Sequence, residues 1–229
     1  MNVEAPSASV GGRTTRGCGS RRRAAATAVL ACAVLLTGCT WQSERPGSAP
    51  RSLAPGACSS LDEAGVAQIR SSRTIRLDMR SGMLEKTAVA LDADVDRGPD
   101  IDTRRTGKLH LAIAAPSGEV ADDTGYVRFD TSAGRTDFRE VTYFLTAPSL
   151  KELSALIRDG VRRYGIDGES AESWIASTEA DPRTRSSFSI TPGTSIGLSV
   201  NYDLRYDGAK STQVVIVHVS PIARARPTT

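Results

Sequence analysis

Gly193-Thr194-Ser195-Ile196-Gly197 matches the pattern G-x-S-x-G, in which the serine can be the nucleophile of a hydrolase. Such a serine lies on a sharp turn between a strand and a helix, and a histidine and an acid must activate its hydroxyl. The residues after Gly197 instead alternate with strand periodicity, and His218 is the only histidine downstream. We therefore prefer a glycine-rich turn between two strands, with a hydrolase that uses Ser195 as the alternative.

Five aspartates form a second candidate for chemistry: Asp92, Asp94, Asp96, Asp100 and Asp102. Their spacing begins like an EF-hand calcium loop, but Arg97 stands where that loop needs glycine and Thr103 where it needs glutamate. Strand alternation explains the first three more simply, because they would point away from an apolar face. We expect a solvated strand end with no bound metal. The alternatives are an irregular Ca²⁺ site at Asp92, Asp94, Asp96 and Asp100, or a hydrolase built on the segment 92–102.

The two histidines, His110 and His218, are expected on separate strands, each opposite the main apolar stripe of its strand. A zinc or iron site needs several ligands in suitable geometry, and no closely spaced histidine pair is present. We expect structural or exposed imidazoles, with no catalytic set and no cofactor.

The first 38 residues have the composition of an export signal. Five arginines, at positions 13, 16, 21, 22 and 23, stand against one acid, Glu4. Residues 24–36 then carry no charge and are rich in alanine, valine and leucine. A basic segment, a short apolar segment and small residues at the exit are typical of a secretory signal peptide. The apolar run is too short for a stable membrane span, which needs about 20 residues.

Leu36-Thr37-Gly38-Cys39 ends this segment and resembles the lipobox of bacterial lipoproteins. In that family the cysteine thiol is joined to diacylglycerol, a peptidase cleaves before the cysteine, and the new amino group can be acylated, for example with palmitate. The resemblance implies that Cys39 carries the lipid and holds the chain on the outer face of the cytoplasmic membrane, because two acyl chains anchor durably. The run 20–23 is similar to a twin-arginine signal, so the export route, general secretory or twin-arginine, stays open.

Removal of residues 1–38 changes the charge of the chain. The removed part holds five of the 29 basic and one of the 26 acidic residues, which leaves 24 and 25. The mature chain is thus nearly neutral, and no basic excess remains to neutralise the phosphates of a nucleic acid. Cys58 would be the only thiol left, because lipid attachment turns Cys39 into a thioether, so no intramolecular disulfide is expected. We expect a shielded small side chain, with pairing between molecules or a reactive thiol as the alternatives.

Three further segments follow the signal peptide. Residues 39–58 contain three prolines among glycine, serine and alanine, which is typical of a tether. Residues 59–222 have the periodicity of a folded domain, and 223–229 are expected to form a flexible tail. Helices are predicted at 61–70, opened by a capping box at Ser60, at 150–164, opened by Ser149 and ended by Gly165, and around Trp174. Strands are predicted at 74–80, 87–96, 108–115, 126–131, 139–146, 195–206 and 211–219.

Strands joined mostly by hairpins, with helices between them, predict a single α+β domain: a mostly antiparallel sheet with two or three helices packed on one face. We expect a lipid-anchored envelope lipoprotein whose domain binds an envelope protein or a small ligand rather than acting as an enzyme. A cell-surface hydrolase is the alternative.

Overall fold

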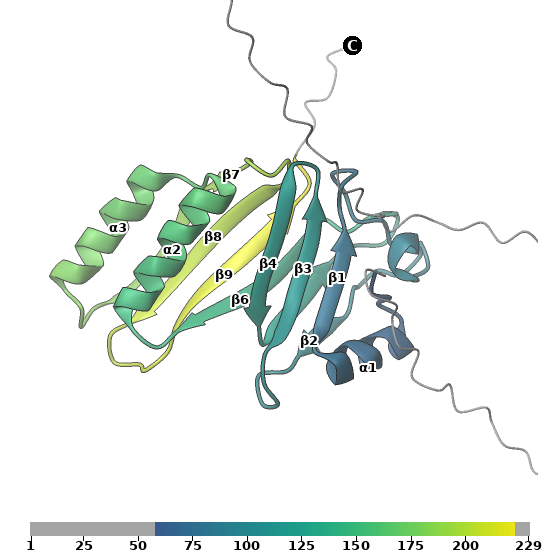
Figure 1. The fold of residues 1–229 in the computed structure, drawn as a ribbon, viewed down its shortest axis with the longest axis horizontal. Coiled ribbons are helices and arrows are strands. Elements are labelled where there is room, and N and C mark those ends of the chain that lie inside the picture. Colours follow the sequence, from purple (N-terminus) through teal and green to yellow (C-terminus); the bar gives the residue numbers. More distant parts are fainter. Residues whose placement is uncertain (1–57, 223–229) are drawn as a thin grey trace, which may run out of the picture.

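The computed structural model describes residues 58–222 as two β-sheets, three α-helices and a short 3₁₀ helix (Figure 1). The strands are β1 (Thr74–Asp78), β2 (Asp100–Asp102), β3 (Leu109–Ala115), β4 (Gly118–Thr124), β5 (Tyr126–Asp130), β6 (Glu140–Ala147), β7 (Arg185–Gly193), β8 (Ser199–Asp207) and β9 (Gln213–Ser220). The helices are α1 (Glu63–Ser72), α2 (Leu150–Tyr164), α3 (Gly168–Ala180) and the 3₁₀ helix η1 (Thr87–Val89). The signal peptide, Cys39, nearly all of the tether and the tail lie outside the described residues.

The two sheets differ in size and pairing. The smaller has the order β1-β3-β4, in which β1 and β3 are parallel and β3 and β4 antiparallel. The larger has the order β2-β5-β6-β9-β8-β7 and is antiparallel throughout. The predicted α+β class with mostly antiparallel strands is therefore confirmed, whereas the division into two sheets was not predicted.

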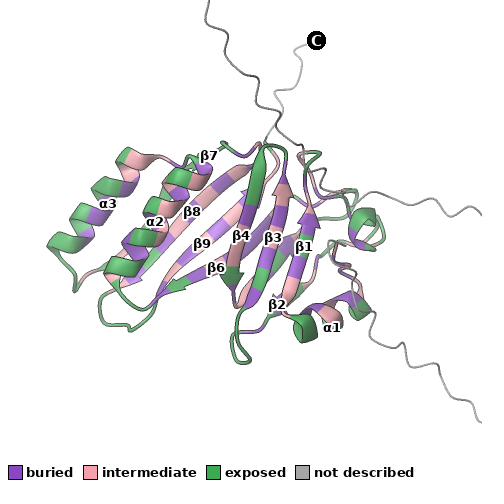
Figure 2. Ribbon diagram, viewed as in Figure 1, coloured by how far each residue is buried: buried purple, intermediate pink, exposed green. Residues whose placement is uncertain are grey.

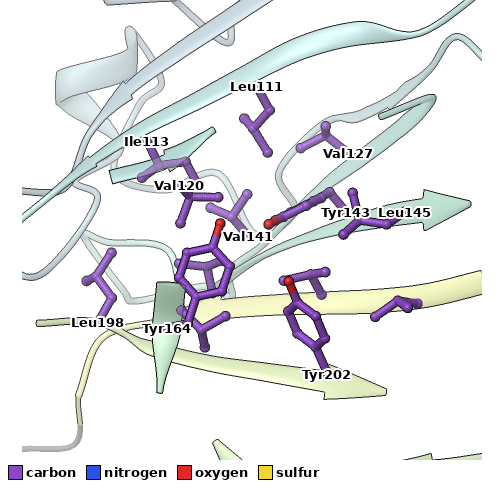
Figure 3. Close-up of a cluster of buried hydrophobic side chains, with 14 of the residues drawn as sticks. Leu111, Ile113, Val120, Val127, Val141, Tyr143, Leu145, Tyr164, Leu198 and Tyr202 are labelled. Atoms are coloured by element: carbon purple, nitrogen blue, oxygen red, sulfur yellow. The ribbon is translucent and has the colours of Figure 1, made fainter. Parts of the chain in front are cut away.

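One face of the six-stranded sheet carries the core. In Figure 1, α2, α3 and the three-stranded sheet lie side by side over this face. Figure 3 shows Leu111 and Val120 of the small sheet close to Val141 and Tyr143 of β6, with Tyr164 of α2 beside them. These side chains are all buried, so the two sheets and the helices share one apolar core.

The opposite face of the six-stranded sheet is covered by no described element. Along β9, buried residues alternate with half-buried ones, as Figure 2 shows by colour. β6 follows the same period of two, except that Thr142 on the open face is also buried. This period of two places one set of side chains in the core and the other on the open face. The open face therefore presents the side chains between the core positions, and these form the candidate site below.

The helix ends follow local capping chemistry. Ser149 accepts a hydrogen bond from the backbone N–H of Glu152 at 3.2 Å, and Gly165 ends α2 in the left-handed conformation, as predicted. At α1 the prediction was wrong in detail: Asp62, not Ser60, is the N-cap, and it accepts from the N–H of Gly65 at 2.7 Å. Ser60 instead donates to the carboxylate of Asp62.

The strand predicted at 87–96 is wrong. This segment forms η1 and a loop, wrapped around the wholly buried side chain of Lys86. Lys86 Nζ donates to the carbonyls of Ala93, Val95 and Ser132, at 3.0, 2.5 and 3.4 Å. Carbonyl groups that accept hydrogen bonds from a buried ammonium are not available for a strand ladder. The segment therefore forms a loop despite its alternating sequence pattern.

The helices and Cys58 bear on the predicted membrane anchor and on the predicted cysteine chemistry. None of the helices within 58–222 has the length and apolar character needed to traverse a bilayer. Cys58 is half-buried and disulfide-bonded in the full chain, whereas the expectation of no intramolecular disulfide concerned the chain without residues 1–38.

Candidate functional site

A depression of about 370 Å³ opens on the uncovered face of the six-stranded sheet. Its volume lies at the lower end of the range for small-ligand sites, and it is open rather than enclosed. Three neighbouring strands line it: Tyr126, Arg128 and Asp130 from β5, Glu140, Thr142 and Phe144 from β6, and Ile216 and His218 from β9.

Strand register brings these side chains together. Thr142 of β6 lies between Arg128 of β5 and His218 of β9 in the ladder. One pair further along, Phe144 lies opposite Ile216. Directly opposed residues of antiparallel strands point to the same side, so these pairs form two adjacent rows across the open face.

One side of the depression is apolar. The rings of Tyr126 and Phe144 stack with their centroids 4.8 Å apart and their planes at 30°. The guanidinium of Arg104 lies over the Tyr126 ring, 5.4 Å from its centroid. Both rings are half-buried, as is the neighbouring Ile216, although no described element covers them. The stack is held in one arrangement and leaves an apolar edge available for contact.

The other side of the depression holds a histidine between two acids. His218 Nδ1 lies 2.7 Å from Oε1 of Glu140, and Thr142 Oγ1 donates to the same oxygen at 2.6 Å. His218 Nε2 lies 3.8 Å from a carboxylate oxygen of Asp203 on β8. The hydrogen bond to Glu140 raises the pKa of His218 despite partial burial, and the same bond lowers the pKa of Glu140. The pair therefore favours an imidazolium beside a carboxylate.

This arrangement can bind polar groups and can exchange a proton. A carboxylate that fixes Nδ1 leaves Nε2 to donate to or accept from a ligand, as in general acid–base sites. Nucleophilic catalysis would also need a hydroxyl or thiol beside Nε2. Among the hydrogen bonds of the described residues, none joins His218 to a serine, threonine or cysteine side chain, and the Thr142 hydroxyl is directed at Glu140.

Ser195 lies away from this acid–base pair. It is exposed in the turn between β7 and β8, where its backbone N–H donates to the carbonyl of Tyr164 at 3.2 Å. The preferred interpretation of a turn between two strands is confirmed. Within 58–222, no histidine or acid side chain is hydrogen-bonded to its hydroxyl, so the structure brings no catalytic partner to Ser195.

The acidic segment is divided between a loop and a strand. Asp92, Asp94 and Asp96 are exposed in the loop after η1, whereas Asp100 and Asp102 lie on β2. Asp102 is hydrogen-bonded to Arg104, and Asp100 lies 3.9 Å from Arg128. Among the described residues, no three histidine, cysteine, aspartate or glutamate side chains are placed to hold one metal ion. The candidate Ca²⁺ ligands are thus not gathered around a common point.

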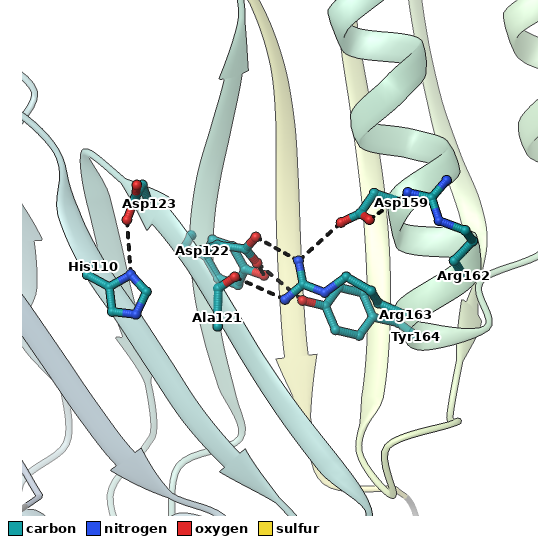
Figure 4. Close-up of polar contacts among 9 residues, drawn as sticks. His110, Ala121, Asp122, Asp123, Asp159, Arg162, Arg163 and Tyr164 are labelled. Carbon is teal, nitrogen blue, oxygen red and sulfur yellow. Dashed lines mark hydrogen bonds and ion pairs between the residues drawn. The ribbon is translucent and has the colours of Figure 1, made fainter. Parts of the chain in front are cut away.

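A second polar cluster lies inside the core and was not predicted. Asp122 of β4 accepts hydrogen bonds from the hydroxyl of Tyr143 at 2.6 Å, the hydroxyl of Tyr164 at 3.3 Å and the guanidinium of Arg163 at 3.1 Å (Figure 4). Burial raises the pKa of Tyr143 well above its ordinary value, and the nearby carboxylate adds to this shift. The cluster joins β4, β6 and α2, and only its Arg163 side reaches solvent, so we interpret its role as structural.

The two histidines are on exposed strand faces, as predicted. His110 lies on β3 with Nδ1 3.0 Å from Asp123, and both side chains are more than half exposed. Figure 4 shows this pair pointing away from the buried Asp122 cluster. His218 lines the depression described above, because it faces the open side of the larger sheet.

Glu140 and Thr142 were not singled out from the sequence. Alternation in REVTYFLT does place Glu140, Thr142 and Phe144 on one face, opposite Val141, Tyr143 and Leu145. The missing information was that β6 pairs with β9, a strand far along the chain, which places Thr142 directly opposite His218. Without that pairing, no pattern links Glu140 to His218.

Comparison of this chain with models of known protein families, with curated protein sequences and with solved structures found no match.

Proposed function

We propose that this chain is a lipid-anchored envelope protein, held on the outer face of the cytoplasmic membrane through Cys39, whose domain binds a ligand or partner on the open face of the six-stranded sheet. The anchor rests on the signal-like segment and the lipobox at residues 36–39. The binding function rests on the domain that follows the tether. No catalytic step and no cofactor belong to this proposal.

The observation that carries the binding function is the composition of the open face. Half-buried Tyr126, Phe144 and Ile216 lie beside a polar group centred on His218, in a depression that no described element fills. A sheet face that only met solvent would need no such aromatic stack, whereas binding sites combine apolar surface with a few fixed polar groups.

Lipid attachment is tested on Cys39→Ser. We expect the full chain expressed in a bacterial host to partition into the detergent phase and to carry the mass of a diacylglyceryl group, and the variant to lose both. A thioether sulfur cannot also form a disulfide. Mass spectra recorded with and without reductant therefore distinguish a Cys39 that carries lipid from a Cys39 that pairs with another cysteine. An identical acylated species in the variant would refute the anchor.

Binding on the open face is tested by photo-crosslinking in membranes. A photo-reactive amino acid replaces Arg128, which is exposed at the depression, or Arg162, which is exposed on α2 on the other side of the sheet. We expect a discrete crosslinked product from position 128 and none of that mass from position 162. Equal products from both positions, or none from either, would contradict a binding face at this place.

The hydrolase alternative keeps one supporting observation, the Glu140–His218 pair. A His–acid pair can act as a general base on water, without Ser195 or the acidic segment 92–102. Ester and glycoside substrate panels on the full chain and on the variants His218→Asn, Ser195→Ala and Asp94→Asn distinguish the three possible hydrolase sites. Activity that is lost only in His218→Asn would favour a hydrolase that uses the Glu140–His218 pair over a binding domain.

A further inference from the structure

The charges of the open face are paired with one another. Each carboxylate in or next to the depression has a basic neighbour: Asp100 with Arg128, Asp102 with Arg104, Asp130 with Arg139, Glu140 with His218, and Asp203 with Arg205. No sign of charge is left in excess, so a charged ligand would have to compete with an existing pair. The face is matched to an uncharged ligand.

The same pairs set hydrogen-bond acceptors beside donors. Within 58–222, Oε2 of Glu140 and Nε2 of His218 make no hydrogen bond to another group. The first is an acceptor, and the second is a donor in the imidazolium form. On the next strand, Asp203 and Arg205 repeat the arrangement, with 3.2 Å between their charged atoms. A hydroxyl group both donates and accepts, so neighbouring acceptors and donors satisfy it fully.

An added peptide strand does not fit this position. β5, β6 and β9 each have a neighbour on both sides in the sheet, so their backbone N–H and C=O groups are engaged in ladders. Peptides that bind by strand addition use an unpaired edge strand, which here means β2 or β7. Recognition on the open face must come from side chains.

We propose, on the basis of the binding function above, that the open face takes a neutral oligosaccharide. Sugar hydroxyls would occupy the acceptor and donor groups of Glu140, His218, Asp203 and Arg205. The carbon-bound hydrogens of a sugar ring would pack against the apolar side formed by Tyr126, Phe144 and Ile216. The depression is open, so a longer chain can continue across the sheet beyond the residue that it holds.

The test uses the full-length chain, purified from membranes in a zwitterionic detergent that contains no sugar. Cellohexaose, mannohexaose and chitohexaose are the neutral probes, and hexagalacturonate is the anionic control, each titrated calorimetrically up to about 10 mM, where a Kd of about 1 mM is still measurable. We expect at least one neutral hexasaccharide to bind, and Phe144→Ala to weaken that binding at least tenfold.

Phe188→Ala is the matched control, because Phe188 is exposed on β7 and shares the other sheet face with Leu204. It should bind as the unchanged chain does. Asp203→Asn keeps the test decisive should Phe144→Ala fail to fold, and it too should weaken binding at least tenfold. Absence of binding by all three neutral probes, or binding that survives both Phe144→Ala and Asp203→Asn, overturns the inference. Selective binding of hexagalacturonate at this face would overturn it while leaving the proposed binding face intact.

Discussion

Replacing Asp122 by alanine would remove the acceptor at the centre of the buried polar cluster. The carboxylate is 11% exposed and accepts from Tyr143, Tyr164 and Arg163. Tyr143 is wholly buried, and Asp122 is the hydrogen-bond partner of its hydroxyl. The variant would remove the charged acceptor of this hydroxyl and would remove an anion that faces a partly buried guanidinium.

The size of the effect follows from these contacts. A buried donor left unsatisfied costs about 1–3 kcal/mol, and a hydrogen bond to a charged group contributes about 1.5–3 kcal/mol. Removing one member of a fully buried charged pair costs about 3–5 kcal/mol, but the Arg163 side chain is 30% exposed, so the loss of this pair costs less. The contacts share one carboxylate and are not additive, so we expect Asp122→Ala to lower the free energy of unfolding by about 2–4 kcal/mol.

The neighbouring residue provides a matched control. Asp123 also ends in a carboxylate with a partner, His110, but its side chain is 67% exposed and that of His110 is 51% exposed. Asp123→Ala should change the free energy of unfolding by less than about 0.5 kcal/mol. Urea unfolding followed by the fluorescence of the largely buried Trp174 measures both variants, with the denaturant slope checked for constancy.

A double-mutant cycle isolates the strongest contact of the cluster. Asp122→Asn and Tyr143→Phe, alone and combined, should show a coupling free energy above about 1 kcal/mol, because the 2.6 Å hydrogen bond is charge-assisted and buried. If Asp122→Ala and Asp123→Ala unfold at the same urea concentration, or if the cycle gives no coupling, Asp122 does not stabilise the fold through these contacts.

Two further predictions concern buried or paired charges. The lowered pKa of Glu140 means that its contribution is complete above about pH 4.5 and is lost as the pH falls, whereas the raised pKa of His218 means that its contribution is complete below about pH 6.5 and is lost as the pH rises. The difference in unfolding free energy between the unchanged chain and His218→Asn should thus be largest at about pH 5.5, and a difference that is constant with pH would contradict the pairing. Lys86→Met should speed tryptic cleavage at the exposed Arg97, because the carbonyls that enclose Nζ lose their donor, whereas Lys151→Met on the exposed side of α2 should leave it unchanged. Equal cleavage rates in the two lysine variants would show that Lys86 does not hold the loop.

Local sequence patterns correctly predicted several helices and strands of the fold. The period of α2, its N-cap Ser149 and its terminal Gly165 predict a helix that the structure confirms at Leu150–Tyr164. The alternation in residues 139–146 and 211–219 predicts β6 and β9 for the same reason: each has one face in the core. Where burial on one side decides the structure, the pattern of apolar residues is sufficient.

The failures have physical causes that lie outside any local pattern. Residues 87–96 alternate like a strand, but their carbonyls turn towards the buried ammonium of Lys86. β4 was missed because Asp122 and Asp123 interrupt its apolar pattern, and the structure pairs one acid with buried tyrosines and leaves the other in solvent. The Glu140–His218 pair depends on a contact 78 residues apart in sequence. The candidate site depends on such long-range contacts, and no local spacing of residues in the sequence predicts them.

Intact-mass spectrometry of the chain recovered from bacterial membranes decides whether Cys39 anchors this domain to the outer face of a membrane, as we propose. We expect a chain that begins at residue 39 and carries a diacylglyceryl group, with the addition absent in Cys39→Ser. A chain that retains residues 1–38, or an unmodified amino terminus at any position, would contradict it.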